Sequence, residues 1–320
     1  MAGLEMEQNI DPLIDEFIID LKTKGVSSHT ITEYPRYVME FHAFIGGGDL
    51  LAVDETVVKN YLVHLRSRTT KRVGRQNKLA KSSIKKYMAA LSVFFDFLFW
   101  NGKITINPVP RVRKQYMRDY KAHNASQRRR CITIPQAKTL VESILDPREK
   151  AVVLLLLKTG MRRHELAELD LSSVDLPNLT IHIKPTAKRS NEIVYFDSET
   201  ENILSKWLKV REKENKNKIN ALFLDRFGNR LSPVAICRIV TKHAAVVGLH
   251  DPSSIRLEDK LTPHSLRHAF TTWLNDAGMK REMIQFLRGD TGTESIDTYI
   301  HFTDATVKRA YLEYMPKLNI

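Results

Sequence analysis

Apolar residues recur at helical spacing through most of the first 107 residues, in four stretches separated by short polar segments. Their apolar positions include Leu13, Phe17 and Leu21, then Tyr34, Val38 and Phe41, then Val58, Leu62 and Leu65, and finally Ile84, Leu91 and Phe95. Serine and aspartate, which favour helix N-caps, precede the later stretches. We therefore predict four helices and a small all-α domain, with Ser82 or Ser83 capping the fourth helix.

The pattern changes after residue 108. Residues 109–130 show no apolar periodicity and hold eight Lys and Arg against one acid, which predicts an extended basic linker. From Cys131 onward helical patterns return, except that Thr180–Lys184 alternates as a strand does and the apolar run Ile193–Phe196 predicts a second strand. We therefore predict a helical domain over 1–108, a linker over 109–130, and a mixed, α-rich domain with a β-hairpin over 131–320.

Positive charge is concentrated in one part of the chain. The protein has 50 Lys and Arg against 37 Asp and Glu, a net charge of +13. Residues 59–130 hold 19 of the basic residues and only two acids, so this window carries +17 and the rest sums to −4. Such a concentration predicts a surface that follows a polyanion, here double-stranded DNA. The candidate phosphate contacts are Lys78, Lys81, Lys85, Lys86, Arg128, Arg129 and Arg130.

Other features narrow the class of protein. The longest strongly apolar run, residues 151–157, is far shorter than the roughly 18–20 residues that a membrane helix needs. The first ten residues lack the pattern of a secretory signal. Cys131 and Cys237 are far apart and have no zinc-ligand spacing, so we expect neither a disulfide framework nor a structural metal. A reducing cytoplasm is the expected location.

Three short motifs carry residue types suited to phosphate chemistry. They are Thr159–Leu166 (TGMRRHEL), Leu261–His268 (LTPHSLRH) and Thr298–His301 (TYIH). Breaking and rejoining a phosphodiester without a metal requires a side-chain nucleophile and fixed positive donors. Arginine suits the second task because its planar guanidinium binds two phosphate oxygens and stays charged.

In their order and spacing these motifs resemble those of the tyrosine recombinases, the family of phage-type integrases and Xer-like site-specific recombinases. The likeness extends through Gly25–Tyr34, Ser83–Leu91 and Gly102–Pro108, so it spans nearly the whole chain. The resemblance implies a mainly α fold with a helical, SAM-like core-binding domain. It also implies an α-rich mixed catalytic domain with a small β-hairpin, the DNA-breaking-rejoining fold, and two domains that close around DNA like a clamp.

The resemblance implies a role for each motif residue. Tyr299 corresponds to the nucleophile that forms a 3′-phosphotyrosine. Arg162 and Arg267 correspond to the pair that binds the scissile phosphate, and His264 shares that phosphate. Glu165 is expected to pair with an arginine. The family uses neither ATP nor a metal, so we expect no cofactor and no metal ligand.

The general acid is the first departure from the family pattern. The family donates the leaving-group proton from a lysine on a hairpin. Its usual offset falls on Ala187 here, so Lys188 is the nearest candidate and Lys184 the alternative.

Asp290 is the second departure. It stands nine residues before Tyr299, where the family usually has histidine or tryptophan, and in this it resembles some archaeal members. An ionised aspartate cannot donate a hydrogen bond to a phosphate. It can accept one from Tyr299 or orient an arginine, and Arg288 is then the candidate for the missing donor.

These observations together predict a site-specific recombinase that cleaves and rejoins double-stranded DNA. The resemblance implies a homo-tetramer on paired DNA sites, with residues 305–320 docking into a neighbouring subunit. Integration or excision of a mobile element and resolution of chromosome or plasmid dimers both remain open as biological roles.

Three alternatives have less support. A monomeric type IB topoisomerase shares the chemistry, but the N-terminal motifs match recombinases. A non-catalytic DNA-binding protein that retains the fold would explain Asp290 and the shifted lysine. A metal-dependent nuclease would need clustered carboxylates, and the sequence has none at suitable spacing.

Overall fold

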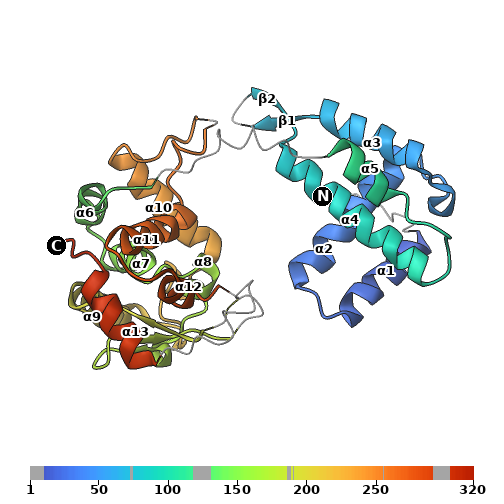
Figure 1. Cartoon of the computed structure of the whole chain (residues 1–320). Coiled ribbons are helices and arrows are strands. Elements are labelled where there is room, and N and C mark those ends of the chain that lie inside the picture. The colour runs from blue at the N-terminus through green and yellow to red at the C-terminus, as the bar shows by residue number, and fades with distance from the viewer. Residues whose placement is uncertain are drawn as a thin grey trace, which may run out of the picture. The chain divides into compact units, whose positions relative to one another are not determined.

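A computed structural model describes residues 11–72, 75–117, 131–185, 189, 191–254, 256–290 and 303–320. The chain divides after His123 into two compact units, each with its own hydrophobic core (Figure 1). Helices dominate both units, as predicted. Within the described ranges, no helix is both long and apolar enough to cross a membrane.

The first unit is helical. Its helices are α1 (Pro12–Thr23), α2 (Ser28–Phe44), α3 (Glu55–Ser67), α4 (Lys81–Trp100) and α5 (Val109–Tyr116), with a 3-10 turn at Leu50–Ala52. Asp11, Ser27 and Asp54 cap the first three helices with their side chains. The apolar faces meet in a core rich in aromatic rings, where Phe41 and Phe94 are fully buried. The four predicted helices are confirmed.

A short β-ribbon joins α3 to α4, which the prediction of an all-helical domain missed. Strand β1 (Thr69–Arg72) pairs antiparallel with β2 (Arg75–Lys78). The ribbon closes with a hydrogen bond from the Leu79 amide to the Arg68 carbonyl, at 3.0 Å. The sequences of the two strands contain only polar and basic residues, so the alternation that marks a half-buried strand is absent from them.

The start of α4 also differs from the prediction. The helix begins at Lys81, and its N-cap is Ala80, which offers no capping side chain. The predicted cap at Ser82 or Ser83 is therefore wrong. The ribbon ends at Lys78 and the helix begins only three residues later, so both serines lie inside the first helical turn.

Helix α5 corrects the linker predicted over residues 109–130. Val109 and Val112 lie about one turn apart and are buried in the core of the first unit. Two valines in a short basic stretch are too few for periodicity to reveal a helix; only the core that they fill does so. Residues 118–130, with the candidate DNA contacts Arg128–Arg130, lie outside the described part of the chain.

The second unit has a central helix, α7 (Pro147–Thr159), that is buried over most of its length. Its helices are α6 (Ile134–Glu142), α7 (Pro147–Thr159), α8 (Arg163–Ala167), α9 (Ser198–Glu214), α10 (Pro233–Val246), α11 (Pro263–Asp276), α12 (Arg281–Arg288) and α13 (Asp304–Tyr314), with a 3-10 turn at Leu171–Ser173. All residues from Ala151 to Thr159 are buried, because α7 packs against α9, α10 and α11 within this unit (Figure 1). This accounts for the uninterrupted apolar run in the sequence.

A three-stranded antiparallel sheet in the order β3-β4-β5 lies in the second unit. The predicted hairpin is confirmed: β4 (Thr180–His182) pairs with β5 (Ile193–Tyr195). The additional strand β3 (Val174–Asp175) was not predicted, because two residues are too few to show alternation.

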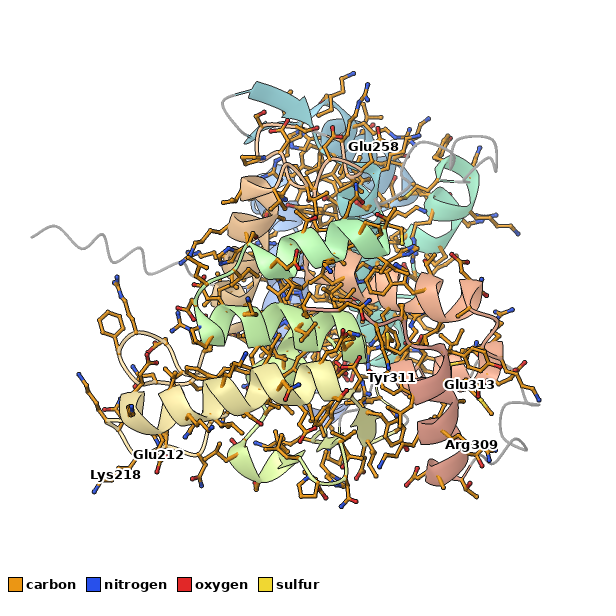
Figure 2. The ribbon with its side chains drawn as sticks, turned by 90° about the vertical axis from the view of Figure 1, so that its left-hand side faces the viewer. Glu212, Lys218, Glu258, Arg309, Tyr311 and Glu313 are labelled. Atoms are coloured by element: carbon orange, nitrogen blue, oxygen red, sulfur yellow. The ribbon has the colours of Figure 1, made fainter. Side chains whose placement is uncertain are left out.

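The C-terminal segment packs on its own unit. Tyr311 of α13 is buried and donates a hydrogen bond to the Lys158 carbonyl at 2.9 Å, and Figure 2 shows Arg309 and Glu313 elsewhere on the same helix. The buried Lys158 ammonium donates to the Pro316 carbonyl at 2.8 Å and also pairs with two carboxylates. Leu318, only 2% exposed, joins the main core.

Candidate active site

The end of α7 delivers Arg162 to the site. Gly160 ends this helix in the left-handed conformation, with φ +61°, and a Cβ there would lie 2.4 Å from the Phe270 ring. Glycine is therefore required both by the backbone and by packing. Arg162 follows in extended conformation at the N-cap of α8, where its backbone N–H donates to Glu165 Oε2 at 2.6 Å. Its Nη1 donates to Glu165 Oε1 at 3.0 Å, so one carboxylate holds the residue at two points.

Arg267 reaches the same place from α11. Its side chain is buried and donates from Nη1 to the Gly160 carbonyl at 2.6 Å and from Nη2 to the Arg288 carbonyl at 2.9 Å. Burial, and then the nearby Arg162, lower the pKa of Arg267 to about 10. The side chain is thus still charged at neutral pH, while its orientation is set by two backbone carbonyls.

Asp290 connects the two arginines. Its Oδ1 accepts hydrogen bonds from Arg162 Nη2 at 3.2 Å and from Arg267 Nη2 at 2.8 Å, and Oδ2 lies 3.0 Å from Arg288 Nε. Of the two uses that the sequence left open for this aspartate, the structure shows the contact with arginines. Arg288, the candidate for a missing donor, is also paired with this carboxylate.

A pocket of about 450 Å³ opens beside these arginines. Its lining residues are Met161, Arg162, Arg163, His164, Cys237, Thr262, Pro263, His264 and Arg267. His264 therefore lies in the same pocket as Arg162 and Arg267. Arg163 and His164 are exposed and also line this pocket. Three of the nine lining residues are arginines and none is acidic, so the pocket favours an anionic group.

Arg189 is a residue of this site that the sequence analysis missed. Its buried guanidinium donates to Glu165 Oε2 at 2.9 Å, and burial lowers its pKa while Glu165 opposes that shift. Because an arginine in a polar hairpin loop looks solvated in the sequence, only its burial identifies it. No group of three or more His, Cys, Asp or Glu residues in the described ranges is placed to hold a metal.

Comparison with known families decides the classification. Residues 130–306 match the phage integrase family, and residues 14–102 match the N-terminal SAM-like domain of phage integrases. The first match alone covers more than half of the chain. This chain belongs to the phage integrase family.

Individual tyrosine recombinases match this chain over nearly its full length. XerC of Pelotomaculum thermopropionicum is 28% identical over 95% of this chain and 98% of its own, and XerD of Listeria innocua is 25% identical over 96% and 100%. The Tn1549 transposon integrase in complex with transposon right end DNA shares the fold, with a TM-score of 0.67, 20% identity and 95% and 99% coverage. A lambda integrase dimer bound to a COC' core site gives a TM-score of 0.63, with 16% identity and 91% and 97% coverage.

Two residues that the family resemblance singled out, Lys188 and Tyr299, lie outside the described residues, so the structure does not test their roles. The alternative acid Lys184 is described. Its Nζ pairs with Asp170 Oδ2 at 2.9 Å, and Asp170 also binds Arg230. Hydrogen bonds from Arg230 and then Lys184 lower the pKa of Asp170, so this carboxylate stays ionised and holds Lys184 in an ion pair.

The candidate DNA contacts of the first unit lie around a hollow of about 380 Å³. Lys78, Lys81 and Lys85 line it together with the apolar Leu62 and Ile84. Lys86 is exposed on α4 but is not part of this lining. Three of the predicted lysines thus lie together around one hollow of the first unit.

Proposed function

We propose that this integrase is a site-specific recombinase that cleaves and rejoins DNA strands through a 3′-phosphotyrosine. Family membership supports strand cleavage and rejoining, since the matched family is the phage integrase family. The roles of individual residues are our assignment.

The convergence of two arginines on one anionic oxygen carries this proposal. Arg162 and Arg267 come from separate segments, yet one nitrogen of each lies within 3.2 Å of the same Asp290 oxygen. Four guanidiniums and two carboxylates meet here, which leaves two excess positive charges. A pentacoordinate phosphorane carries more negative charge than a phosphodiester, so fixed positive donors stabilise the transition state more than the ground state.

The family chemistry and our residue assignments give the following reaction. The Tyr299 hydroxyl loses its proton to water, its oxygen attacks phosphorus, and the bond from phosphorus to the 5′-oxygen breaks. A lysine, Lys188 in our assignment, protonates that oxygen. Arg162, Arg267 and His264 bind the non-bridging oxygens. The phosphotyrosine keeps the phosphate in an ester bond. A 5′-hydroxyl of another strand therefore attacks this phosphorus, displaces the tyrosine and rejoins the DNA without ATP.

A suicide DNA substrate tests the proposed function. A nick near the cleavage position lets the freed fragment diffuse away, so the enzyme becomes trapped on the DNA as an adduct that survives denaturation. A protein that only binds DNA gives reversible mobility shifts and no such adduct. Absence of the adduct on DNA that the protein binds specifically would leave the non-catalytic alternative.

Removing the lysines of the first unit should weaken DNA binding in a salt-dependent way. If Lys78, Lys81, Lys85 and Lys86 all contact phosphates, changing them to glutamine should make the slope of log K against log salt shallower by about 3 to 4, since each contact contributes about 0.9. The slope is measured by fluorescence anisotropy over a salt series.

Four lysines of the second unit provide the matched control for that slope. Lys206, Lys209, Lys213 and Lys218 are exposed on or just after α9, and Figure 2 shows Lys218 near the end of that helix. Their replacement changes the net charge equally but should leave the slope within error. Equal changes in both variants would contradict a phosphate-binding role for the first set.

Sulfur at the leaving position should rescue loss of the general acid. Lys188→Ala should cripple cleavage of a normal 5′-oxygen but spare a 5′-bridging sulfur, because a thiolate, whose conjugate thiol has a pKa of about 8.5, leaves unprotonated far better than an alkoxide, whose conjugate alcohol has a much higher pKa. The rates of adduct formation on the two substrates measure this. Sulfur rescue of Lys184→Ala and not of Lys188→Ala would move the acid to Lys184.

We further propose that the protein acts as a homo-tetramer in the cytoplasm. The support is the apolar character of residues 305–320, although in the single chain Val307, Tyr311 and Leu318 of this segment are buried on their own unit. Docking into a neighbour therefore requires that these contacts be exchanged. Cys131 and Cys237 are free thiols, the state that a reducing cytoplasm maintains. Cross-linking on DNA that carries two sites measures the subunit number.

A further inference from the structure

We propose that Arg189 is a positioning residue for DNA cleavage, which holds Glu165, and through it Arg162, in the orientation that the scissile phosphate requires. The inference rests on the proposed function of Arg162. Arg189 itself does not touch DNA, because its side chain is only 1% exposed.

Every nitrogen of the Arg189 guanidinium has an acceptor. Nε donates to the Asn191 carbonyl at 2.8 Å, and Nη1 donates to Glu165 Oε2 at 2.9 Å. At 3.3 Å, Nη1 also reaches the Arg288 carbonyl and Nη2 the Leu287 carbonyl. One side chain therefore joins the β4–β5 loop, helix α8 and the C-terminal end of α12.

Glu165 transmits this constraint to Arg162. The carboxylate is 5% exposed, and its Oε2 accepts from both Arg189 and the Arg162 backbone while Oε1 accepts from the Arg162 side chain. A buried carboxylate needs cationic partners and hydrogen bonds on both oxygens. Because Arg189 binds Glu165 Oε2, Glu165 Oε1 remains available to hold Arg162 Nη1. Arg162 Nη2 then points toward Asp290.

The same residue is linked to the second phosphate-binding arginine. The Arg288 carbonyl accepts from Arg189 Nη1 and also from Arg267 Nη2, at 2.9 Å. Arg189 also packs closely on the turn after α12, where a Cβ on Gly289 would lie 2.5 Å from Arg189 Cγ. Its contacts thus converge on the two arginines that meet at Asp290.

Arg211 offers a matched control in the same unit. It is also buried, 3% exposed, and burial lowers its pKa as it does for Arg189. It donates only to backbone carbonyls, those of Ile219 and Ala221 at the end of the α9 loop. Loss of either arginine leaves buried acceptors unpaired and lowers stability, but only Arg189 contacts Glu165.

The experiment compares Arg189→Met and Arg189→Lys with Arg211→Met and Arg211→Lys. For each variant we measure the melting temperature, DNA affinity and single-turnover adduct formation on suicide substrates with a 5′-oxygen or a 5′-bridging sulfur. The Arg189 variants should lose about 100-fold in adduct rate, the size expected from misplacing a catalytic group by about 1 Å. The sulfur substrate should not restore this loss, because stabilisation of the non-bridging oxygens is what is missing. DNA affinity should change by no more than about twofold, since many other phosphate contacts set it.

The Arg211 variants should lower the melting temperature to a similar extent but keep adduct rates within a few-fold of the unmodified protein. The losses from Glu165→Gln and Arg189→Met should also be non-additive in the double variant, as for residues that act through one contact. If Arg189→Met does not fold, Arg189→Lys retains the buried charge and carries the test.

Three results would overturn the inference: equal loss in the Arg189 and Arg211 variants, additive loss with Glu165→Gln, or rescue by the bridging sulfur. Rescue by sulfur would mean that Arg189 instead positions the general acid on its own loop. If the unmodified protein forms no adduct, the proposed function itself fails. If the unmodified protein forms the adduct and Arg189→Met forms it at the same rate, only the proposed role of Arg189 is refuted.

Discussion

Tyr299→Phe should abolish the covalent protein–DNA adduct while leaving DNA affinity nearly unchanged. The substitution removes one oxygen, the atom that would bond to phosphorus, and keeps the ring. Denaturing gels of a labelled suicide substrate measure the adduct, and anisotropy measures affinity.

Two further tyrosines close to the C-terminus act as controls for this assignment. The Tyr311 hydroxyl is buried and bonded to the Lys158 carbonyl, and burial raises its pKa well above the ordinary value, so it is a poor nucleophile. Tyr311→Phe should lower stability by about 1 kcal/mol and leave adduct formation unchanged. Tyr314→Phe should have little effect on either. Adduct remaining in Tyr299→Phe and lost in Tyr314→Phe would move the nucleophile to Tyr314.

Arg162→Ala or Arg267→Ala should lower the rate of adduct formation by several orders of magnitude. Removal of one preorganised donor from a developing oxyanion costs about 10²–10³ in rate, and a charged, two-pronged donor costs more. Arg267→Ala should also lower the melting temperature, because it leaves the buried Gly160 and Arg288 carbonyls without this donor. Arg162 is 35% exposed, so its loss should affect stability less.

Lysine substitutions and a neighbouring arginine separate charge from geometry. Arg162→Lys and Arg267→Lys keep a positive charge but lose the planar fork, so most of the rate loss should persist. Arg163→Ala, next to Arg162 at the edge of the pocket, should change the rate only a few-fold. Near-normal cleavage by Arg162→Ala or by Arg267→Ala would refute the assignment of the phosphate-binding pair.

The helices of the first unit were predictable because local signals agree there. Asp54 caps α3, and Val58, Leu62 and Leu65 repeat on the face that the core covers. The hairpin of the second unit was predictable for a similar reason, since β4 alternates between buried and less buried positions and β5 is a short apolar run. Elements with weak local signals, such as α5 and the β1–β2 ribbon, were not.

The site divides in the same way. Motif spacing and family resemblance pointed to Arg162, His264 and Arg267, and the fold brings all three to one pocket. The sequence left open whether Asp290 accepts a hydrogen bond from Tyr299 or orients an arginine, because a pattern along the chain does not show which distant side chains are in contact. The structure shows this carboxylate in contact with both Arg162 and Arg267.

The sequence alone determined the family, the helical framework and the residue types of the chemistry, because caps, periodicity and motifs are local properties of the chain. Tertiary structure alone decided that Arg189 is buried against Glu165 and that Arg162 and Arg267 share one carboxylate oxygen. Burial and charge pairing arise between segments that are 23 to 128 residues apart. Such contacts depend on how helices pack, and packing is a property of the whole core rather than of any one stretch of sequence.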